Sequence, residues 1–362
     1  MTFDEARALF PVLERVTYLN AGTFGPLARE TVEVMLEQLE RDLERGRSGK
    51  PYIDEMIEER ARVRGAIAEL VRADPERISL TASTTDGCNI VLLGLGLEPD
   101  DEIVTTDTEH FGLAGPVFAS GATVRVARVQ QLGAEEALEA IAAEVTEKTR
   151  LLAVSHVIWT NGVVLDVHAL KERTGVPIVV DGAQSVGAID VDVRALDYYT
   201  VSGQKWLCGP ESTGALYVAD ADALRVARPG YFAQQSFEPG GRYVPREGAE
   251  RFDPGWISVA ALKGLATALG LAPEWRFERI AEAAARCREA LAERVRVVTP
   301  AGQAGLVTFE VAEDPEGVVA SLLAENVVVR SVPGTKWLRA SCGWWTSDDD
   351  IARLVRALST ES

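Results

Sequence analysis

The spacing of apolar residues changes after residue 71. Before that point they recur every three or four positions, which predicts two long amphipathic helices at 28–45 and 53–71. Beyond it, short and continuously apolar runs alternate with helical windows. Strands are predicted at 78–81, 102–105, 123–129, 151–157, 177–180, 199–201 and 215–218. Continuous apolar runs are typical of strands buried on both faces, so the pattern predicts a mostly parallel, seven-stranded α/β sheet.

The other predicted elements divide the chain into a large and a small part. Helices are predicted between the strands at 90–95, 135–145 and 167–172, and a Gly- and Pro-rich stretch at 228–254 predicts a loop. Two more helices follow at 258–271 and 275–295. The last segment predicts a strand at 306–311, a helix at 315–325, strands at 327–332 and 338–341, and a helix at 348–358. We therefore expect a large domain over 18–255 and a smaller α+β domain formed by 1–17 and 256–362.

Charge and cysteine content narrow the classes of function. The 362 residues carry a formal net charge of −18, and such an acidic surface disfavours nucleic-acid and membrane partners. No apolar run approaches the ~20 residues that cross a bilayer, and the charged N-terminus lacks an apolar signal core. The four cysteines show no paired C-x-x-C pattern, which is typical of a reducing compartment. We expect a cytoplasmic protein.

The strongest chemical signal lies between residues 177 and 210. One apolar strand ends in Asp181, and the next runs into Lys205 three residues after Ser202. Ligands of open α/β sheets lie at the carboxyl ends of the strands, so both side chains are expected to face one crevice. A lysine amine can form a Schiff base with pyridoxal phosphate (PLP), and a carboxylate can keep its pyridine nitrogen protonated. The alternative is that Asp181 caps a loop and Lys205 lies on the surface, but the pair at two strand ends favours a PLP site.

A phosphate site is predicted at residues 80–89, where a strand runs through small residues into a helix. Free backbone N–H groups and the positive end of the helix dipole favour a phosphate there, and Thr85 can add a hydroxyl. Simple N-capping by a Ser or Thr is the alternative. His110 follows the strand at 102–105, so its imidazole could stack on the pyridine ring. The three histidines show no metal-ligand spacing, so no metal site is expected.

Taken together, these segments resemble the class V aminotransferases, a group of fold-type I PLP enzymes, over essentially the whole chain. The motifs that carry the resemblance are 18–22 (YLNAG), 81–85 (TASTT), 108–110 (TEH), 155–157 (SHV), 181–184 (DGAQ), 202–206 (SGQKW) and 251–253 (RFD). Within the group, the chain is most similar to the cystine/cysteine C–S lyases. That similarity rests on the runs 85–92 (TDGCNIVL), 197–199 (DYY) and 303–307 (QAGLV).

The resemblance implies a role for each matching residue. Lys205 would hold the cofactor and move the Cα proton, Asp181 would pair with the pyridinium, and His110 would stack on the ring. Gln184 would contact the ring hydroxyl. Arg339 would bind the substrate carboxylate. The phosphate would lie among Ser83, Thr84, Thr85, Ser202 and Gln204, and further substrate-binding candidates are Arg330, Asn20 and Trp159.

The chain departs from the family pattern at three positions. Gln204 stands where many relatives carry His, Trp159 where many carry Asn, and Trp256 where a Thr usually reaches the phosphate of a neighbouring subunit. The resemblance implies a homodimer with sites shared between subunits, and the residue at 256 weakens that implication.

A missing residue argues against one reaction type. Cysteine desulfurases need a nucleophilic cysteine just before the carboxylate-binding arginine, and residues 330–339 (RSVPGTKWLR) contain none. The resemblance then favours C–S β-lysis of a cysteine- or cystine-like amino acid, which yields pyruvate and ammonia by way of aminoacrylate. Class V amino transfer and epimerisation like that of isopenicillin N epimerase stay open, as does a non-catalytic PLP-binding module.

Overall fold

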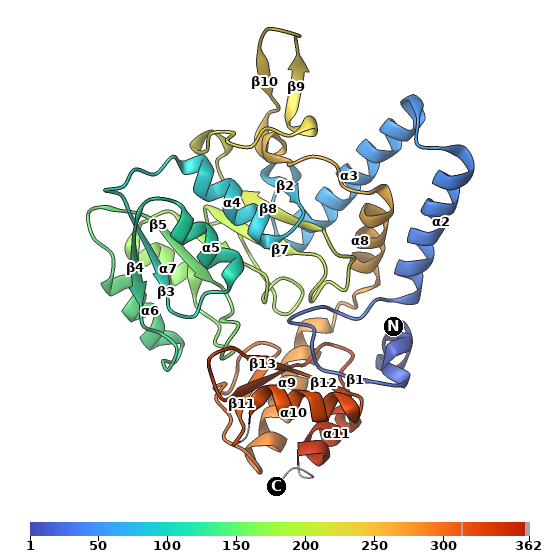
Figure 1. The fold of residues 1–362 in the computed structure, drawn as a ribbon, viewed down its shortest axis with the longest axis vertical. Helices are drawn as coiled ribbons and strands as arrows, with labels where there is room; N and C mark the ends of the chain where they lie inside the picture. Colours follow the sequence, from blue (N-terminus) through green and yellow to red (C-terminus); the bar gives the residue numbers. More distant parts are fainter. Residues whose placement is uncertain (313, 359–362) are drawn as a thin grey trace.

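The computed structural model describes residues 1–312 and 314–358 and is built around a seven-stranded sheet (Figure 1). Its strand order is β2-β8-β7-β6-β5-β3-β4, and β8 alone runs against the other six. The strands are β2 (Ile78–Thr81), β3 (Glu102–Thr106), β4 (Thr123–Ala127), β5 (Thr149–Ser155), β6 (Ile178–Asp181), β7 (Tyr198–Ser202) and β8 (Gly214–Val218). The prediction of a mostly parallel, seven-stranded sheet is confirmed, and each predicted strand end lies within two residues of the observed one.

Helices cover both faces of this sheet. On one face, alternate strand residues such as Val180 and Tyr199 pack against α3 (Gly49–Val71), α6 (Ala134–Ala143), α7 (Val167–Thr174) and α8 (Val259–Leu271). On the other, their neighbours Val179 and Tyr198 pack against α4 (Thr84–Leu95) and α5 (Phe111–Ala119). Burial of both faces is the physical reason why the strands are continuously apolar. The long helix α2 (Arg29–Arg45) packs on α8.

The C-terminal part forms a second, smaller layer below the main sheet (Figure 1). Its antiparallel sheet has the order β11-β14-β13, formed by β11 (Leu306–Glu310), β14 (Trp337–Ser341) and β13 (Arg330–Val332). The helices of this layer are α9 (Arg276–Ala292), α10 (Pro315–Ala324) and α11 (Asp348–Leu358). The N-terminal segment joins it, because β1 (Thr17–Tyr18) pairs in parallel with β12 (Val327–Val328).

Three predicted elements need correction, and two helices were not predicted. The predicted loop at 228–254 contains a hairpin of β9 (Gln234–Phe237) and β10 (Tyr243–Pro245), which protrudes from the large part (Figure 1). The strand predicted at 327–332 is divided into β12 and β13. The helix predicted at 90–95 begins six residues earlier, because Ser83 accepts a hydrogen bond from the Asp86 N–H and caps it. Helices α1 (Phe3–Ala8) and α5 were missed. In α5, a nearly all-apolar sequence with an internal Pro hides the helical period.

The described residues form neither a membrane-spanning helix nor a cluster of metal-ligating side chains. No helix within 1–312 or 314–358 is long and apolar enough to cross a membrane. In the same ranges, no group of three or more His, Cys, Asp or Glu side chains is arranged to hold a metal ion.

Candidate active site

The carboxyl ends of the central strands bring the predicted site residues to one edge of the sheet. Strand β6 ends at Asp181, which pairs in register with Ser155 at the end of β5 and with Thr200 in β7. Strand β7 ends at Ser202, and Lys205 lies in the turn that follows. This is the edge at which open α/β sheets bind their ligands.

Asp181 is a buried carboxylate whose charge is incompletely matched. The residue is only 3% exposed. Oδ1 accepts hydrogen bonds from the Ala183 N–H at 2.9 Å and from the Thr200 hydroxyl at 3.4 Å. Among the salt bridges of the described chain, none includes Asp181. Because a buried charge is costly unless it is paired, this carboxylate fits a cationic group such as a pyridinium.

Lys205 is held in a tight turn by backbone hydrogen bonds. Its carbonyl accepts from the Cys208 N–H at 3.0 Å, and Gly209 N–H closes the turn on the Gly203 carbonyl at 2.9 Å. The N-terminal segment passes directly over it, since Gly25 N–H donates to the Gln204 carbonyl at 2.8 Å. A side chain at Gly25 would lie 2.2 Å from the Lys205 carbonyl oxygen, so only glycine fits there.

The amine of Lys205 is prepared to react at neutral pH. Burial is the main cause that lowers its pKa to about 8; the Asp181 carboxylate acts in the opposite direction, and the guanidinium groups of Arg339 and Arg330 add to the lowering. We expect the rate of Schiff-base formation between the apoprotein and PLP to rise with pH and to level off above about pH 8, because only the neutral amine attacks an aldehyde. Stopped-flow absorbance over a pH series measures this. A rate that keeps rising to about pH 10, as for an ordinary lysine, would contradict the prediction.

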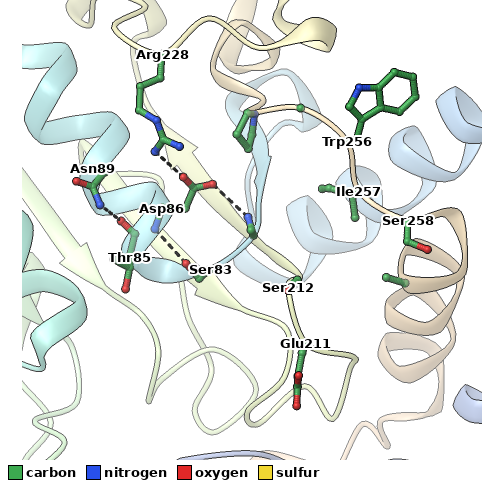
Figure 2. A pocket seen from close by; sticks show the side chains of 14 residues that line it. Ser83, Thr85, Asp86, Asn89, Glu211, Ser212, Arg228, Trp256, Ile257 and Ser258 are labelled. Atoms are coloured by element: carbon green, nitrogen blue, oxygen red, sulfur yellow. Dashed lines mark hydrogen bonds and ion pairs between the residues drawn. The ribbon is translucent and has the colours of Figure 1, made fainter.

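The predicted phosphate residues lie at the first turn of α4. Ser83 caps the helix, and Thr84 and Thr85 follow it, so their backbone N–H groups point out of the helix N-terminus. Figure 2 shows Ser83 and Thr85 on the wall of an adjoining groove. From the neighbouring turn, the Ser202 hydroxyl donates to Gln204 Oε1 at 2.8 Å. Ser83, Thr84 and Thr85 thus lie at one helix N-terminus, while Ser202 ends β7 and Gln204 lies in the turn that follows it.

His110 lies at the start of α5 with a defined protonation state. Its Nδ1 accepts a hydrogen bond from the Gly112 N–H at 3.1 Å, so the proton of the neutral ring is on Nε2. Burial, and then the positive charge of Lys205, lower its pKa to about 4. The ring meets Trp159 edge-on, with centroids 5.2 Å apart. A side chain at Gly112 would lie 2.6 Å from the Thr85 hydroxyl, so this glycine lets α5 approach the phosphate residues.

Glu109 is a site residue that the sequence analysis missed. Its carboxyl group accepts hydrogen bonds from the Ser155 hydroxyl at 2.5 Å, from the Ser155 N–H at 3.2 Å and from the Thr106 hydroxyl at 2.7 Å. Burial raises its pKa to about 7. It ties the end of β3 to the end of β5, beside Asp181. The one sequence signal was its place directly before His110, after an apolar strand.

Arg339 is a buried guanidinium with unused hydrogen-bond donors. The residue is 0% exposed, and its Nη1 donates to the Trp159 carbonyl at 2.7 Å. Among the described residues, Nε and Nη2 have no hydrogen-bond partner, and neither has the nearby hydroxyl of Ser341. A side chain at Gly22 would lie 2.7 Å from Nη2 and fill this space. Buried unpaired donors are costly, so the group fits a ligand carboxylate, which a guanidinium can bind with two parallel hydrogen bonds.

The other predicted substrate residues surround Arg339. Arg330 pairs with it in register across β13 and β14, and its guanidinium carbon lies 5.4 Å from the centre of the Trp159 ring. Asn20 forms a bridge to Ser341 and accepts from the Thr23 hydroxyl at 2.9 Å. Gln184 lies beside the same segment, since its Nε2 donates to the Gly22 carbonyl at 2.9 Å.

Substitution of Arg339 by lysine should weaken substrate binding more than turnover. A lysine keeps the charge but loses the planar pair of donors, so we expect the KM for the amino acid to rise about 100-fold while kcat changes much less. Steady-state kinetics on the folded variant, checked by its Tm, measure this. Arg330→Lys is the matched control, because Arg330 is only partly buried, and we expect its KM to rise about 5-fold. Equal effects of the two variants would contradict the assignment.

None of the four cysteines is placed as an exposed nucleophile. Cys88, Cys208, Cys287 and Cys342 are all buried. Cys342 follows β14, three residues after Arg339, and a hydrogen bond with Cys287 together with burial raises the pKa of its thiol. Because the thiolate is the reactive form, these cysteines are poor acceptors of sulfur.

Comparison with known proteins finds a matching family model, similar sequences and a similar solved structure. The family model for aminotransferase class-V matches residues 17–354. Isopenicillin N epimerase of Amycolatopsis lactamdurans is 31% identical over 95% of this chain and 94% of its own length. A probable cysteine desulfurase of Methanothermobacter thermautotrophicus is 26% identical over 99% and 98%. The solved complex between the cystine C–S lyase C-DES and its reaction product cysteine persulfide is 29% identical, covers 97% of this chain and 99% of that one, and superposes with a TM-score of 0.91.

Proposed function

The chain belongs to the aminotransferase class-V family and is a PLP-dependent enzyme of fold type I, and we propose that it cleaves the C–S bond of a cystine-like amino acid. The observation that carries this proposal is the pair of guanidinium groups of Arg339 and Arg330 beside Lys205, on a segment without a cysteine. Cystine has a second carboxylate, which can form an ion pair with the second guanidinium. A desulfurase mechanism would need a nearby thiolate that this segment does not supply.

The residues that would hold the cofactor follow from the geometry above. The Lys205 amine would bond to its aldehyde carbon, Asp181 would face the ring nitrogen, and the neutral His110 ring would cover one face. Gln184 would reach the ring hydroxyl. The phosphate would lie against Ser83, Thr84, Thr85, Ser202 and Gln204. When bound, PLP supplies an electron sink for the electrons left on the substrate Cα after its proton is removed.

The protein's own groups would then position the substrate and move its proton. Arg339 would bind the α-carboxylate and Arg330 the distal carboxylate, with Asn20 and Trp159 lining the pocket. The Lys205 amine, whose pKa is lowered by burial, would take the Cα proton as a general base. The overall reaction converts cystine and water into pyruvate, ammonia and cysteine persulfide. The persulfide anion released from cystine is a better leaving group than the hydrosulfide released from cysteine, which also favours cystine.

A product assay tests this function. The purified holoenzyme is incubated with cystine, cysteine and thioethers, pyruvate is measured with lactate dehydrogenase, and products are identified by mass. We expect pyruvate and persulfide from cystine at a higher rate than from cysteine. Absence of pyruvate, together with transfer of the amino group to a keto acid, would overturn the proposal.

Epimerisation is the second candidate, because a relative with that name is 31% identical over nearly the whole chain. It would exchange the Cα hydrogen for deuterium in D₂O and invert the stereocentre without releasing pyruvate. A non-catalytic PLP-binding role would give a borohydride label on Lys205 but no product with any amino acid.

We include a cytoplasmic homodimer in the proposal, with a large domain over 18–255 and a small one from 1–17 and 256–362. Support for the dimer comes from exposed apolar side chains on α2, where Leu36 and Leu39 are each 53% exposed. Leu39 also lines a groove of about 500 Å³ with Phe24 and Gln204. Because Gln204 precedes Lys205, a second copy seated there would cover the site.

Substitution of Leu39 by glutamate should separate the subunits. A charge on this apolar face would be desolvated in the dimer, so we expect light scattering to show a monomer and cofactor titration to show weaker PLP binding. Leu323→Glu is the matched control, since Leu323 is 57% exposed on α10, away from the groove, and this variant should stay dimeric. A dimeric Leu39→Glu protein would contradict this interface.

A further inference from the structure

The groove beside the phosphate residues carries an excess of negative charge. It has a volume of about 680 Å³ and is lined by Ser83 and Thr85 together with two carboxylates, Asp86 and Glu211 (Figure 2). Among the described residues that line it, Arg228 alone is positively charged. A phosphate ester carries nearly two negative charges at neutral pH, so the balance of charge at this groove bears directly on its binding.

Asp86 is fixed within one helical turn of the capping residue. Its backbone N–H donates to Ser83 Oγ at 3.1 Å, and its carboxylate accepts from the Ala82 N–H at 3.3 Å. The side chain is 12% exposed, so water screens its charge poorly. A carboxylate is favourable at a helix N-terminus with no ligand, but it repels a second anion bound to the same terminus.

Arg228 neutralises this carboxylate from a distant part of the chain. It lies in the segment after β8, and its Nη1 donates to Asp86 Oδ1 at 2.7 Å. Figure 2 shows the guanidinium above the Asp86 carboxylate, with Thr85, the preceding residue of α4, below it. Gln204, the phosphate candidate next to Lys205, is uncharged, so it cannot take over this role.

We propose that Arg228 is a further residue that sets cofactor affinity, because it cancels the charge of Asp86 beside the phosphate. It acts through Asp86 and is therefore a positioning residue. The inference rests on the proposed PLP site. It predicts that the loss of PLP affinity caused by removing Arg228 is reversed when the negative charge of Asp86 is removed as well.

Equilibrium titration of the apoproteins with PLP, followed by absorbance, tests the idea without any activity measurement. We expect Arg228→Ala to raise the Kd about 10-fold at low ionic strength and much less in about 0.5 M salt. The double variant Arg228→Ala/Asp86→Asn should return to within about 2-fold of the wild-type Kd, since asparagine keeps an acceptor for the Ala82 N–H. The affinity for inorganic phosphate, measured by its competition with PLP, should likewise fall in Arg228→Ala and recover in the double variant.

Arg225→Ala is the matched control. Arg225 lies three residues earlier, and its Nε donates only to the Leu93 carbonyl, so its removal should leave the Kd unchanged. An unchanged Kd for Arg228→Ala would overturn the inference, and so would a double variant as weak as the single one at equal Tm. Failure of the wild-type protein to bind PLP would instead overturn the proposed function.

Discussion

Replacement of Lys205 by alanine is expected to abolish the covalent attachment of PLP and to lower the rate of product formation by at least about 10³-fold. The reason is that one amine serves two purposes: it is the bonding partner of the cofactor aldehyde and the base that moves the Cα proton. Lys205 lies in a turn that is closed by the hydrogen bond from the Gly209 N–H to the Gly203 carbonyl. Borohydride reduction of the holoenzyme, digestion and peptide mass mapping measure the attachment.

The matched control is Lys171→Ala. Lys171 is tied by its Nζ to Asp197 at 2.6 Å, on the sheet face covered by α7, and its loss should leave the borohydride label in place. A label on any peptide other than the one containing Lys205, or a Lys205→Ala protein that still acquires a label, would contradict the central proposal of function.

Substitution of Asp181 by asparagine is expected to lower kcat by about 10²-fold to 10³-fold and to weaken PLP binding. An amide can still accept from the Ala183 N–H, so the turn is preserved, but it cannot keep the pyridine nitrogen protonated. The ring then loses most of its capacity to accept electrons. Steady-state kinetics and the absorbance spectrum of the holoenzyme over a pH series measure the change, and a spectrum that titrates in a range where the wild type is constant would be its signature.

Asp190→Asn supplies the comparison. Asp190 lies in the same chain segment but is 56% exposed and pairs with Arg72 at the surface. Its substitution removes one carboxylate without touching the crevice, so kcat and the spectrum should stay as in the wild type. If the two asparagine variants behaved alike, Asp181 would not be the partner of the ring nitrogen.

The sequence predicts the parts of the site that lie at the ends of strands. Asp181 and Lys205 each follow an apolar run, and the rule that ligands bind at the carboxyl ends of parallel strands places them together. The same rule places His110. Ser83 and Thr85 could be predicted from a strand that runs through small residues into a helix.

Contacts between distant segments could not be predicted in this way. Arg228 and Asp86 are 142 residues apart, and neither belongs to a periodic pattern. The burial of Arg339 depends on the way β14 packs under the chain near Gly22, which the sequence does not show. Glu109 looks like an ordinary loop carboxylate until the end of β5 is placed beside it. The hairpin of β9 and β10 was missed because each strand is too short and too polar to give a period.

Residues 19–25 act as a tether between the C-terminal layer and the turn that contains Lys205. Leu19 carbonyl accepts from the Ser341 N–H at 2.7 Å, two residues from Arg339, and Gly25 N–H donates to the carbonyl next to Lys205. Seven residues of continuous backbone, 19–25, therefore link the strand of the guanidinium that would hold the carboxylate to the turn of the amine that would take the proton. Any sliding of the C-terminal layer against the main sheet must stretch or bend this tether. These two hydrogen bonds therefore constrain the distance between the strand that carries Arg339 and the turn that carries Lys205.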